Sequence, residues 1–338
     1  MRDYFLRRLL LVIPTLIGIT ILVFAVTRLV PGGPLERAIM ETQQASMASG
    51  SGSVGQGMAL SASQLQQLQE YYGFDKPWYQ SYADWVMKVV QGDLGTSYRY
   101  NEPVWDVIRD RFPISLFYGL VTLVITYLVC IPLGVVKAIK HRSLMDNATS
   151  IFIFAGYAVP GYVLGALLLL FFSVEMDLFP MGGFTSLQFD RLSPMQQVLD
   201  VLHHAVLPLI CYLVGSFAVT TLLMKNNLMD NLAADYVRTA VAKGVPFRRA
   251  VTGHALRNSL IPVATTFGQN ITLLVGGSFL IETIFDIDGF GLLGLTSIFD
   301  RDYPVVMGIV FLSSLLLLIG NILSDLLVAA VDPRIRFQ

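Results

Sequence analysis

Few side chains in this sequence have the types and spacing that catalysis needs. The chain has four histidines, of which His203 and His204 are adjacent, and no His-Glu-x-x-His zinc motif occurs. No Gly-x-x-x-x-Gly-Lys-Ser/Thr segment is present, so the chain cannot cradle ATP phosphates in that way. Cys130 and Cys211 both lie in apolar runs, which favours inert packing over a disulfide or a metal cluster. These patterns disfavour a membrane enzyme.

Polar side chains inside apolar runs are the next candidates, because they are costly in lipid and mark functional sites there. Gln269 and Asn270 lie near the middle of one apolar run, Asn321 lies in another, and Glu282 follows the end of the first. These four residues could line a translocation path. Hydrogen bonding between helices explains the three amides equally well, and Glu282 could be an exposed carboxylate at the membrane interface.

The elements that position these residues belong to a chain too apolar for a soluble globule. Hydrophobic residues make up 54% of the 338 residues and charged residues 14%, whereas soluble proteins carry about 25% charged residues. The formal net charge of −1 provides no basic footprint for a nucleic acid. We therefore expect the protein to be embedded in a lipid bilayer and to have no nucleic-acid partner.

Six apolar runs without Asp, Glu, Lys or Arg are long enough to cross a hydrocarbon core, which takes about 20 helical residues. They are Leu9–Thr27, Phe112–Val136, Asn147–Val174, Val201–Met224, Asn258–Ile281 and Tyr303–Ser324. The first run contains Pro14 and no small-residue cleavage site follows it, which favours a retained span over a cleaved signal. We predict an all-α membrane protein with six transmembrane helices.

The remaining segments divide the chain around these spans. We predict a cytoplasmic N-terminus and first helix at 1–30, an external loop at 31–111, a five-helix core at 112–328 and a cytoplasmic tail at 329–338. Within the loop, apolar periodicity predicts short amphipathic helices at Leu65–Tyr72 and Tyr79–Val90.

The distribution of basic residues predicts the orientation. One side of a six-span arrangement collects 14 Lys and Arg residues and the other side only 8, spread over many more residues. Because cytoplasmic segments carry the excess of Lys and Arg, both termini are expected in the cytoplasm.

The cytoplasmic connection at 225–258 has the pattern of a helix, a Gly-Pro break and a second helix. Asp230 to Tyr236 offers acidic and Asn residues that suit a helix start, Gly244 suits a left-handed helix end, and Pro246 suits the first turn of the next helix. Such an element can dock into a groove on a partner protein. An amphipathic loop lying on the membrane surface is the alternative interpretation.

The residues of this connection resemble a known family. Asp235-Tyr236-Val237-Arg238-Thr239-Ala240, Ala242-Lys243-Gly244 and His254 to Pro262 (HALRNSLIP) look like the cytoplasmic loop of ABC importer permeases of the dipeptide and oligopeptide group. Further matches are LVIPTL (11–16), PGGP (31–34), YGFDKP (72–77), GDLGTS (92–97), DRDYPV (300–305) and VDPRIRF (331–337). The combination is most similar to the B-type permease of the Yej-type importer for peptides and the peptide-nucleotide antibiotic microcin C.

The resemblance implies the type I importer permease fold in a bacterial inner membrane. It also implies a heterodimer with a second permease, a cytoplasmic ATPase that binds ATP and Mg²⁺, a periplasmic solute-binding protein and a peptide substrate. This chain itself would hold no cofactor or metal. The residues expected to couple it to the ATPase are Asp235, Tyr236, Arg238, Thr239, Ala240, Lys243 and Gly244. Arg238-Thr239-Ala240 stands where the general ABC loop has Glu-Ala-Ala, which leaves open the ATPase residues that it meets.

An ion-coupled secondary transporter is the alternative class. Such a transporter needs ionisable residues near the middle of the membrane to couple protons or sodium ions. None of the six predicted spans has a charged residue at its centre. The sequence therefore favours an importer that is driven by a partner ATPase.

Overall fold

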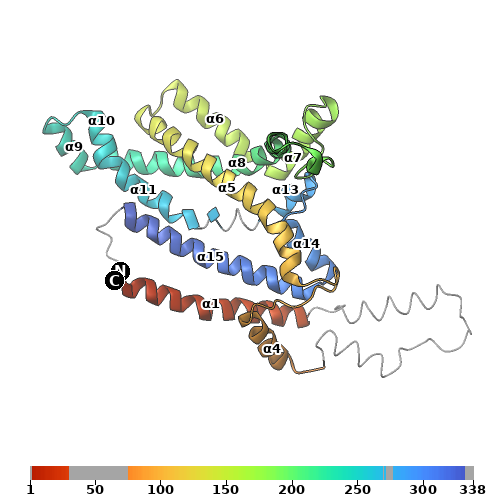
Figure 1. Ribbon diagram of the computed structural model, residues 1–338. Coiled ribbons are helices and arrows are strands. Elements are labelled where there is room, and N and C mark those ends of the chain that lie inside the picture. The colour runs from red at the N-terminus through yellow and green to blue at the C-terminus, as the bar shows by residue number, and fades with distance from the viewer. Residues whose placement is uncertain (1, 30–74, 269, 272–276, 332–338) are drawn as a thin grey trace, which may run out of the picture. The chain divides into compact units, whose positions relative to one another are not determined.

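The computed structural model describes residues 2–29, 75–268, 270–271 and 277–331 (Figure 1). Within these residues the regular structure is helical, apart from one isolated antiparallel bridge between Thr96 and Pro103. The all-α prediction is therefore confirmed. The predicted helix at 65–72, Gln269 and most of the VDPRIRF motif lie outside the described residues.

The chain divides into two compact units. Unit 1 comprises Met1–Val12, Arg111–Leu293 and Leu315–Gln338, and unit 2 comprises Ile13–Asp110 and Gly294–Ser314.

Among the residues that the structure describes, four helices are long and apolar enough to cross a membrane. They are α1 (Arg2–Leu29), α5 (Val104–Ile139), α8 (Pro194–Ala233) and α15 (Tyr303–Val331). A fifth candidate is a bent pair, in which α6 (Leu144–Ala158) meets α7 (Gly161–Leu168) and its π-helical continuation η1 (Leu169–Glu175) at 93°. The bend has a local cause, because Val159 precedes Pro160 and takes the extended conformation that the proline ring imposes.

The remaining predicted span, Asn258–Ile281, is divided in the structure. Helix α11 (Leu256–Thr265) covers its first part, and α13 (Phe279–Ile284) begins after Gly277, whose φ is +65°. A positive φ ends a right-handed helix, and glycine adopts it without a steric penalty. Five of the six predicted spans thus correspond to long helices or the bent pair.

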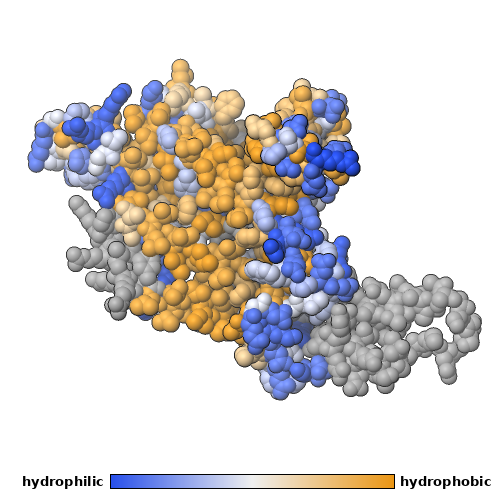
Figure 2. Space-filling view, viewed as in Figure 1, coloured by the Kyte–Doolittle hydropathy of each residue, from blue (hydrophilic) through white to orange (hydrophobic). Residues whose placement is uncertain are grey.

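Helix α8 is the central element of unit 1 and contacts α6, α7 and α11. Where α5 packs on α8, a Cβ added at Gly134 would lie 2.7 Å from the Cβ of Met224, so the two helices approach as closely as glycine permits. On the outer surface, Leu128 is 71% exposed and Phe152 is 81% exposed. Figure 2 shows hydrophobic residues over α5 and α6. Such large apolar surfaces fit contact with lipid or another membrane subunit.

The shorter helices of unit 1 lie at the ends of the long ones. They are η2 (Phe189–Arg191), α9 (Asp235–Ala242), α10 (Phe247–Ala250) and the π-helical η3 (Val251–Ala255), and α14 (Phe290–Asp300) begins in this unit.

Unit 2 joins three helix segments through aromatic and polar contacts. Helix α4 (Trp78–Val90), which confirms the predicted helix at 79–90, packs on α1 through Tyr82. The Tyr82 ring lies 5.4 Å from the Phe24 ring, and its hydroxyl is 2.9 Å from that of Thr20. Asp302 accepts hydrogen bonds from Ser97 Oγ and from the backbone N–H of Tyr98. The GDLGTS and DRDYPV segments therefore meet in this unit.

Candidate functional site

The helix–Gly–Pro–helix loop forms as its sequence predicts. Helix α9 ends in a Schellman motif, in which Val245 N–H donates to Ala240 O at 3.1 Å and Gly244 N–H donates to Val241 O at 2.9 Å. Gly244 has φ +86°, the left-handed conformation that this motif requires. Pro246 lies directly before α10 and not within its first turn, a one-residue difference from the prediction. The loop is thus a defined turn between two helices.

Two anchors hold α9 to the long helices. Val237 is buried in a hydrophobic core with Ala138 of α5 and with Met224 and Leu228 of α8. The Tyr236 hydroxyl donates to Asn231 Oδ1 at 2.6 Å and accepts a hydrogen bond from Asn258 Nδ2 at 3.1 Å. Tyr236 and Asn258 belong to the two halves of the loop pattern, so the structure brings these halves into contact.

The opposite face of α9 is exposed. The side chain of Asp235 is 100% exposed and that of Arg238 is 71% exposed, while Thr239, Lys243 and Gly244 are also exposed and Ala240 is half-buried. In Figure 2 the end of the molecule that carries α9 and α10 is largely hydrophilic. A short anchored helix with a polar outer face has the shape and charge to bind in a groove of a partner protein.

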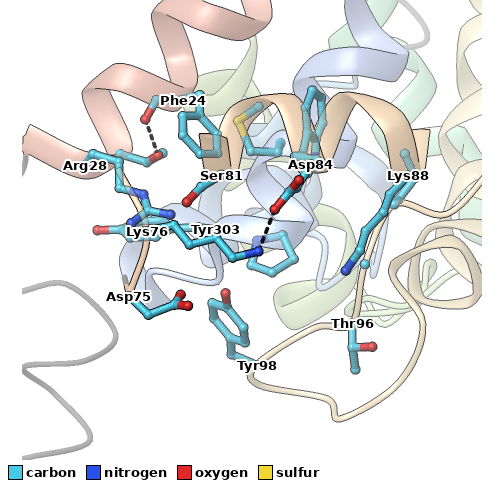
Figure 3. Close-up of a pocket in the computed structure, with 16 residues that line it drawn as sticks. Phe24, Arg28, Asp75, Lys76, Ser81, Asp84, Lys88, Thr96, Tyr98 and Tyr303 are labelled. Atoms are coloured by element: carbon cyan, nitrogen blue, oxygen red, sulfur yellow. Dashed lines mark hydrogen bonds and ion pairs between the residues drawn. The ribbon is translucent and has the colours of Figure 1, made fainter. Parts of the chain in front are cut away.

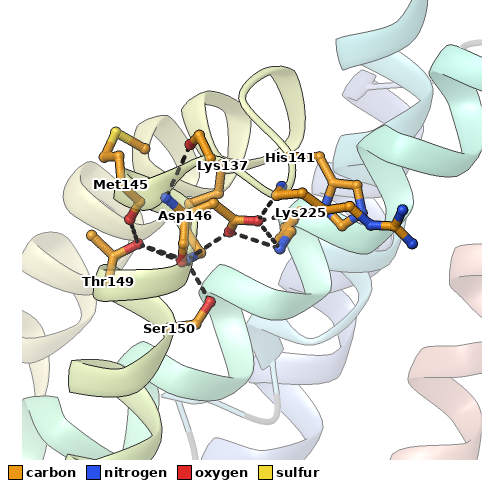
Figure 4. A network of polar contacts seen from close by, with 9 residues as sticks. Lys137, His141, Met145, Asp146, Thr149, Ser150 and Lys225 are labelled. Atoms are coloured by element: carbon orange, nitrogen blue, oxygen red, sulfur yellow. Dashed lines mark hydrogen bonds and ion pairs between the residues drawn. The ribbon is translucent and has the colours of Figure 1, made fainter.

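A buried ion network lies directly beside the core under α9 (Figure 4). The carboxylate of Asp146, at the start of α6, accepts two hydrogen bonds from Lys225 Nζ of α8, at 2.7 and 2.8 Å, and lies 3.0 Å from Lys137 Nζ of α5. Lys137 Nζ also donates to Thr149 Oγ1 at 2.6 Å and to Ser150 Oγ at 2.8 Å. The network therefore ties the ends of α5, α6 and α8 together.

Sequence reasoning missed this network, although a signal was present. Lys137 directly follows the apolar run of α5, Asp146 directly precedes that of α6, and Lys225 directly follows that of α8. All three run ends were expected on the same side of the membrane. Charges that terminate three neighbouring spans on one side are candidates for mutual pairing.

Two of the amides proposed for a translocation path, Asn270 and Asn321, lie near the point where Gly268 contacts Gly320 of α15. Asn270 Nδ2 donates to Tyr127 Oη at 2.8 Å. Asn321 is half-buried on α15, next to Gly320, and the Gly320 backbone is in close contact with Gly268. The structure thus brings the neighbourhoods of Asn270 and Asn321 together.

Glu282 does not lie at an exposed interface, which corrects the alternative of an exposed interfacial carboxylate. Its residue exposure is 0%, its Oε1 accepts from Ser115 Oγ at 2.9 Å, and its Oε2 accepts from Leu292 N–H at 2.6 Å. The N–H of Phe290 donates to the same Ser115 oxygen at 2.8 Å. Tertiary packing of α5 and the start of α14 over α13 buries the carboxylate, a result that the local sequence does not indicate.

Within the part of the chain that the structure describes, no three His, Cys, Asp or Glu side chains are arranged to bind a metal. The arrangement that stands out is therefore the anchored helix α9 with its neighbouring ion network.

Known proteins resemble this chain over its whole length. It is 39% identical to the peptidoglycan transport system permease protein YejB of Agrobacterium fabrum, and the match covers 100% of this chain and 99% of that protein. It is 37% identical to the inner membrane ABC transporter permease protein YejB of Escherichia coli O157:H7, with 100% of both chains covered. It is 36% identical to the oligopeptide transport system permease protein AppB of Bacillus subtilis, again with 100% of both covered.

A family model agrees with these relatives. The model described as binding-protein-dependent transport system inner membrane component matches residues 130–337, which include the anchored helix α9, the ion network and Glu282. This match alone covers more than half of the chain, and the relatives match its full length. The chain therefore belongs to the family of inner membrane components of binding-protein-dependent transport systems.

Proposed function

We propose that this chain is the transmembrane permease subunit of an ATP-driven importer for oligopeptides or peptide-like compounds. Peptide-nucleotide antibiotics such as microcin C are included in this substrate class. The proposal rests on the anchored helix α9, whose exposed residues have no catalytic spacing of their own but suit docking to a partner. The names of the relatives, which concern oligopeptide and peptidoglycan transport, support the substrate class.

In this proposal a cytoplasmic ATPase binds ATP and Mg²⁺ and meets α9 through Asp235, Tyr236, Arg238, Thr239, Ala240, Lys243 and Gly244. A second permease completes a heterodimer, and an external solute-binding protein delivers the substrate. Both chain termini then lie in the cytoplasm, in agreement with the excess of basic residues on that side.

The core and the ion network give a physical route for coupling. Val237 packs against Ala138 and Met224, and these residues are direct sequence neighbours of Lys137 and Lys225. A displacement of α9 would therefore move the ends of α5 and α8. Asp146 joins these two helix ends to α6. Packed protein interiors transmit such displacements because they deform little.

The proposed path passes the crossing near Gly268 and Gly320, where Asn270 and Asn321 are its polar candidates. Gln269, the third amide candidate from the sequence, lies outside the described residues. Glu282 is buried near the outer end of the proposed path and stabilises the helices there. Both of its oxygens accept hydrogen bonds from the protein, so it is suited to holding the start of α14 rather than to contacting a peptide.

Reconstitution tests the proposal. Liposomes that contain this subunit alone should show neither ATP hydrolysis nor peptide uptake driven by a proton or sodium gradient. Liposomes that also contain the second permease, the ATPase and the binding protein should accumulate labelled peptide when ATP is supplied. Gradient-driven uptake by the subunit alone would overturn the assignment in favour of a secondary transporter.

A competition assay in the complete liposomes then sharpens the substrate class. Unlabelled oligopeptides, peptidoglycan-derived peptides and microcin C are added separately to labelled peptide. Each compound that belongs to the class should reduce the uptake of the label.

A further inference from the structure

Unit 2 contains a cavity of about 490 Å³ that the transport proposal does not use (Figure 3). Its wall is formed by the last turns of α1, the segment before α4, α4 itself, the loop at 94–98 and the start of α15. A volume of this size falls within the range of about 300–1,000 Å³ that is typical of small-molecule sites.

The cavity is lined by charges of both signs. Arg28, Lys76 and Lys88 contribute positive charge, and Asp75 and Asp84 contribute negative charge. Figure 3 shows Asp75 and Lys76 directed toward the same space. A ligand that carries an anionic group and an ammonium group would match this wall better than an ion of one sign.

The cationic groups differ in how they are held. Lys76 Nζ lies 2.8 Å from Asp84 Oδ2, and this hydrogen bond raises the pKa of the Lys76 ammonium above its ordinary value. Lys88 is exposed and forms no ion pair within the described residues. Lys88 is therefore available to an anionic ligand, whereas Lys76 is already paired with Asp84.

The cavity lies at the boundary of membrane-spanning segments. Arg28 is in the last turn of the apolar helix α1, and Tyr303 begins the apolar helix α15. Helix α4 exposes apolar and aromatic side chains, including Trp78 (50% exposed), Tyr79 (57%) and Val90 (77%). Tryptophan and tyrosine are enriched at the depth of lipid headgroups, where one end of the ring is apolar and the other polar.

We propose that this cavity binds the headgroup of a zwitterionic phospholipid that has a primary ammonium group. Lys88 attracts the phosphate, and Asp75 accepts hydrogen bonds from the ammonium. The acyl chains extend along the apolar surface of α1, where Leu22 is 63% exposed and Val26 is 48% exposed. A bound lipid of this kind would link unit 2 to the bilayer whichever solute the transporter carries.

The headgroup chemistry makes the proposal specific. A primary ammonium can donate hydrogen bonds to Asp75, whereas the trimethylammonium of phosphatidylcholine cannot. Phosphatidylglycerol has the phosphate but no ammonium group. Comparing phosphatidylethanolamine with phosphatidylcholine therefore tests recognition of the ammonium group, and binding of phosphatidylglycerol tests recognition of the phosphate.

Native mass spectrometry of the purified full-length chain in detergent tests the site with phosphatidylethanolamine, phosphatidylcholine and phosphatidylglycerol as probes. We expect the wild-type chain to retain phosphatidylethanolamine in preference to phosphatidylcholine. Lys88→Gln should weaken phosphatidylethanolamine and phosphatidylglycerol binding about fivefold, because one basic side chain near a lipid surface contributes about that factor. Asp75→Asn should weaken only phosphatidylethanolamine binding.

Lys140→Gln is the matched control, because Lys140 is an exposed lysine outside the cavity and lies near the end of α5. It should leave the preference among the lipids unchanged. If a variant fails to fold, as judged by its melting temperature, the comparison of lipids on the wild-type chain still tests the proposal.

Three outcomes would overturn the proposal. Equal binding of phosphatidylethanolamine and phosphatidylcholine would indicate non-selective lipid association. Equal losses in Lys88→Gln and Lys140→Gln would exclude the cavity as the site. Displacement of the lipid by millimolar inorganic phosphate or by a dipeptide would identify a soluble ligand instead.

Discussion

Two regions of this molecule pair lysines with aspartates, but the ion network of unit 1 is buried and the ion pair of unit 2 is exposed to solvent. In unit 1 the side chains of Lys137, Asp146 and Lys225 are 0%, 3% and 10% exposed. In unit 2 the side chains of Lys76 and Asp84 are 51% and 57% exposed. Buried ions depend on their partners because water cannot replace them, whereas exposed ions exchange partners at little cost.

This difference in solvent exposure limits what each region can do. The buried network fixes three helix ends beside α9, the proposed coupling helix, and its charges are unavailable to any ligand. The exposed pair contributes little to folding, so its side chains can rearrange around a bound headgroup. Burial, rather than residue type, therefore separates a positioning element from a binding surface.

Labelling with a membrane-impermeant thiol reagent should give the largest contrast between the two regions, because accessibility is all or none. Single cysteines are introduced as Lys243→Cys and Glu102→Cys, in a background of Cys130→Ala and Cys211→Ala. Both positions are exposed. In cells with a permeable outer membrane, Glu102→Cys should label, and Lys243→Cys should label only after the inner membrane is opened. The reverse pattern would contradict the predicted orientation.

Removal of Asp146 should have the next largest effect. Asp146→Ala leaves two buried lysines without their counter-ion, so we expect the free energy of unfolding to fall by about 3–5 kcal/mol. Scanning fluorimetry in detergent measures the loss. The double variant Asp146→Ala/Lys225→Met should recover part of it, because one unpaired charge is then also removed. A loss below about 1 kcal/mol would place the network among the weak surface pairs.

The turn after α9 should show a smaller effect on stability but a clear effect on coupling. Gly244→Ala places a Cβ at φ +86°, at a cost of about 1–2 kcal/mol for a left-handed residue. We expect the complex to assemble while ATP hydrolysis stimulated by the binding protein falls.

Gly253→Ala is the matched control for this turn. Nothing lies within 4 Å of a Cβ added there, and its φ is not in the left-handed range. Unchanged stimulated ATP hydrolysis in Gly244→Ala would argue against a docking role for α9.

The exposed pair should give the smallest effect on stability. Lys76→Met and Asp84→Ala each remove one partner, and we expect the melting temperature to stay within measurement error. Because the proposed headgroup contacts are made by Lys88 and Asp75, retention of phosphatidylethanolamine should fall less in these variants than in Lys88→Gln. A marked fall in melting temperature would mean that the pair holds unit 2 together and would weaken the comparison with the buried network.

Features that depend on local chemistry could be predicted from the sequence alone. The apolar runs of α1, α5, α8 and α15 need only length and composition to cross a bilayer, and the structure confirms these four helices. Gly244 at the end of α9 follows from the backbone preference of a single residue. The proposed coupling residues come from a contiguous segment that resembles a known family, and their role stays a prediction.

Features that depend on contacts between distant residues were decided only by the tertiary structure. Asp302 bonds to Ser97, 205 positions away, and Asp146 bonds to Lys225, 79 positions away. Glu282 is polar and follows an apolar run, yet its burial depends on Ser115 of α5 and on the backbone at the start of α14. The sequence determined which segments are helical and apolar, because those properties are local. The packing of those segments decided which charges are buried and paired, because that depends on which helix ends lie side by side.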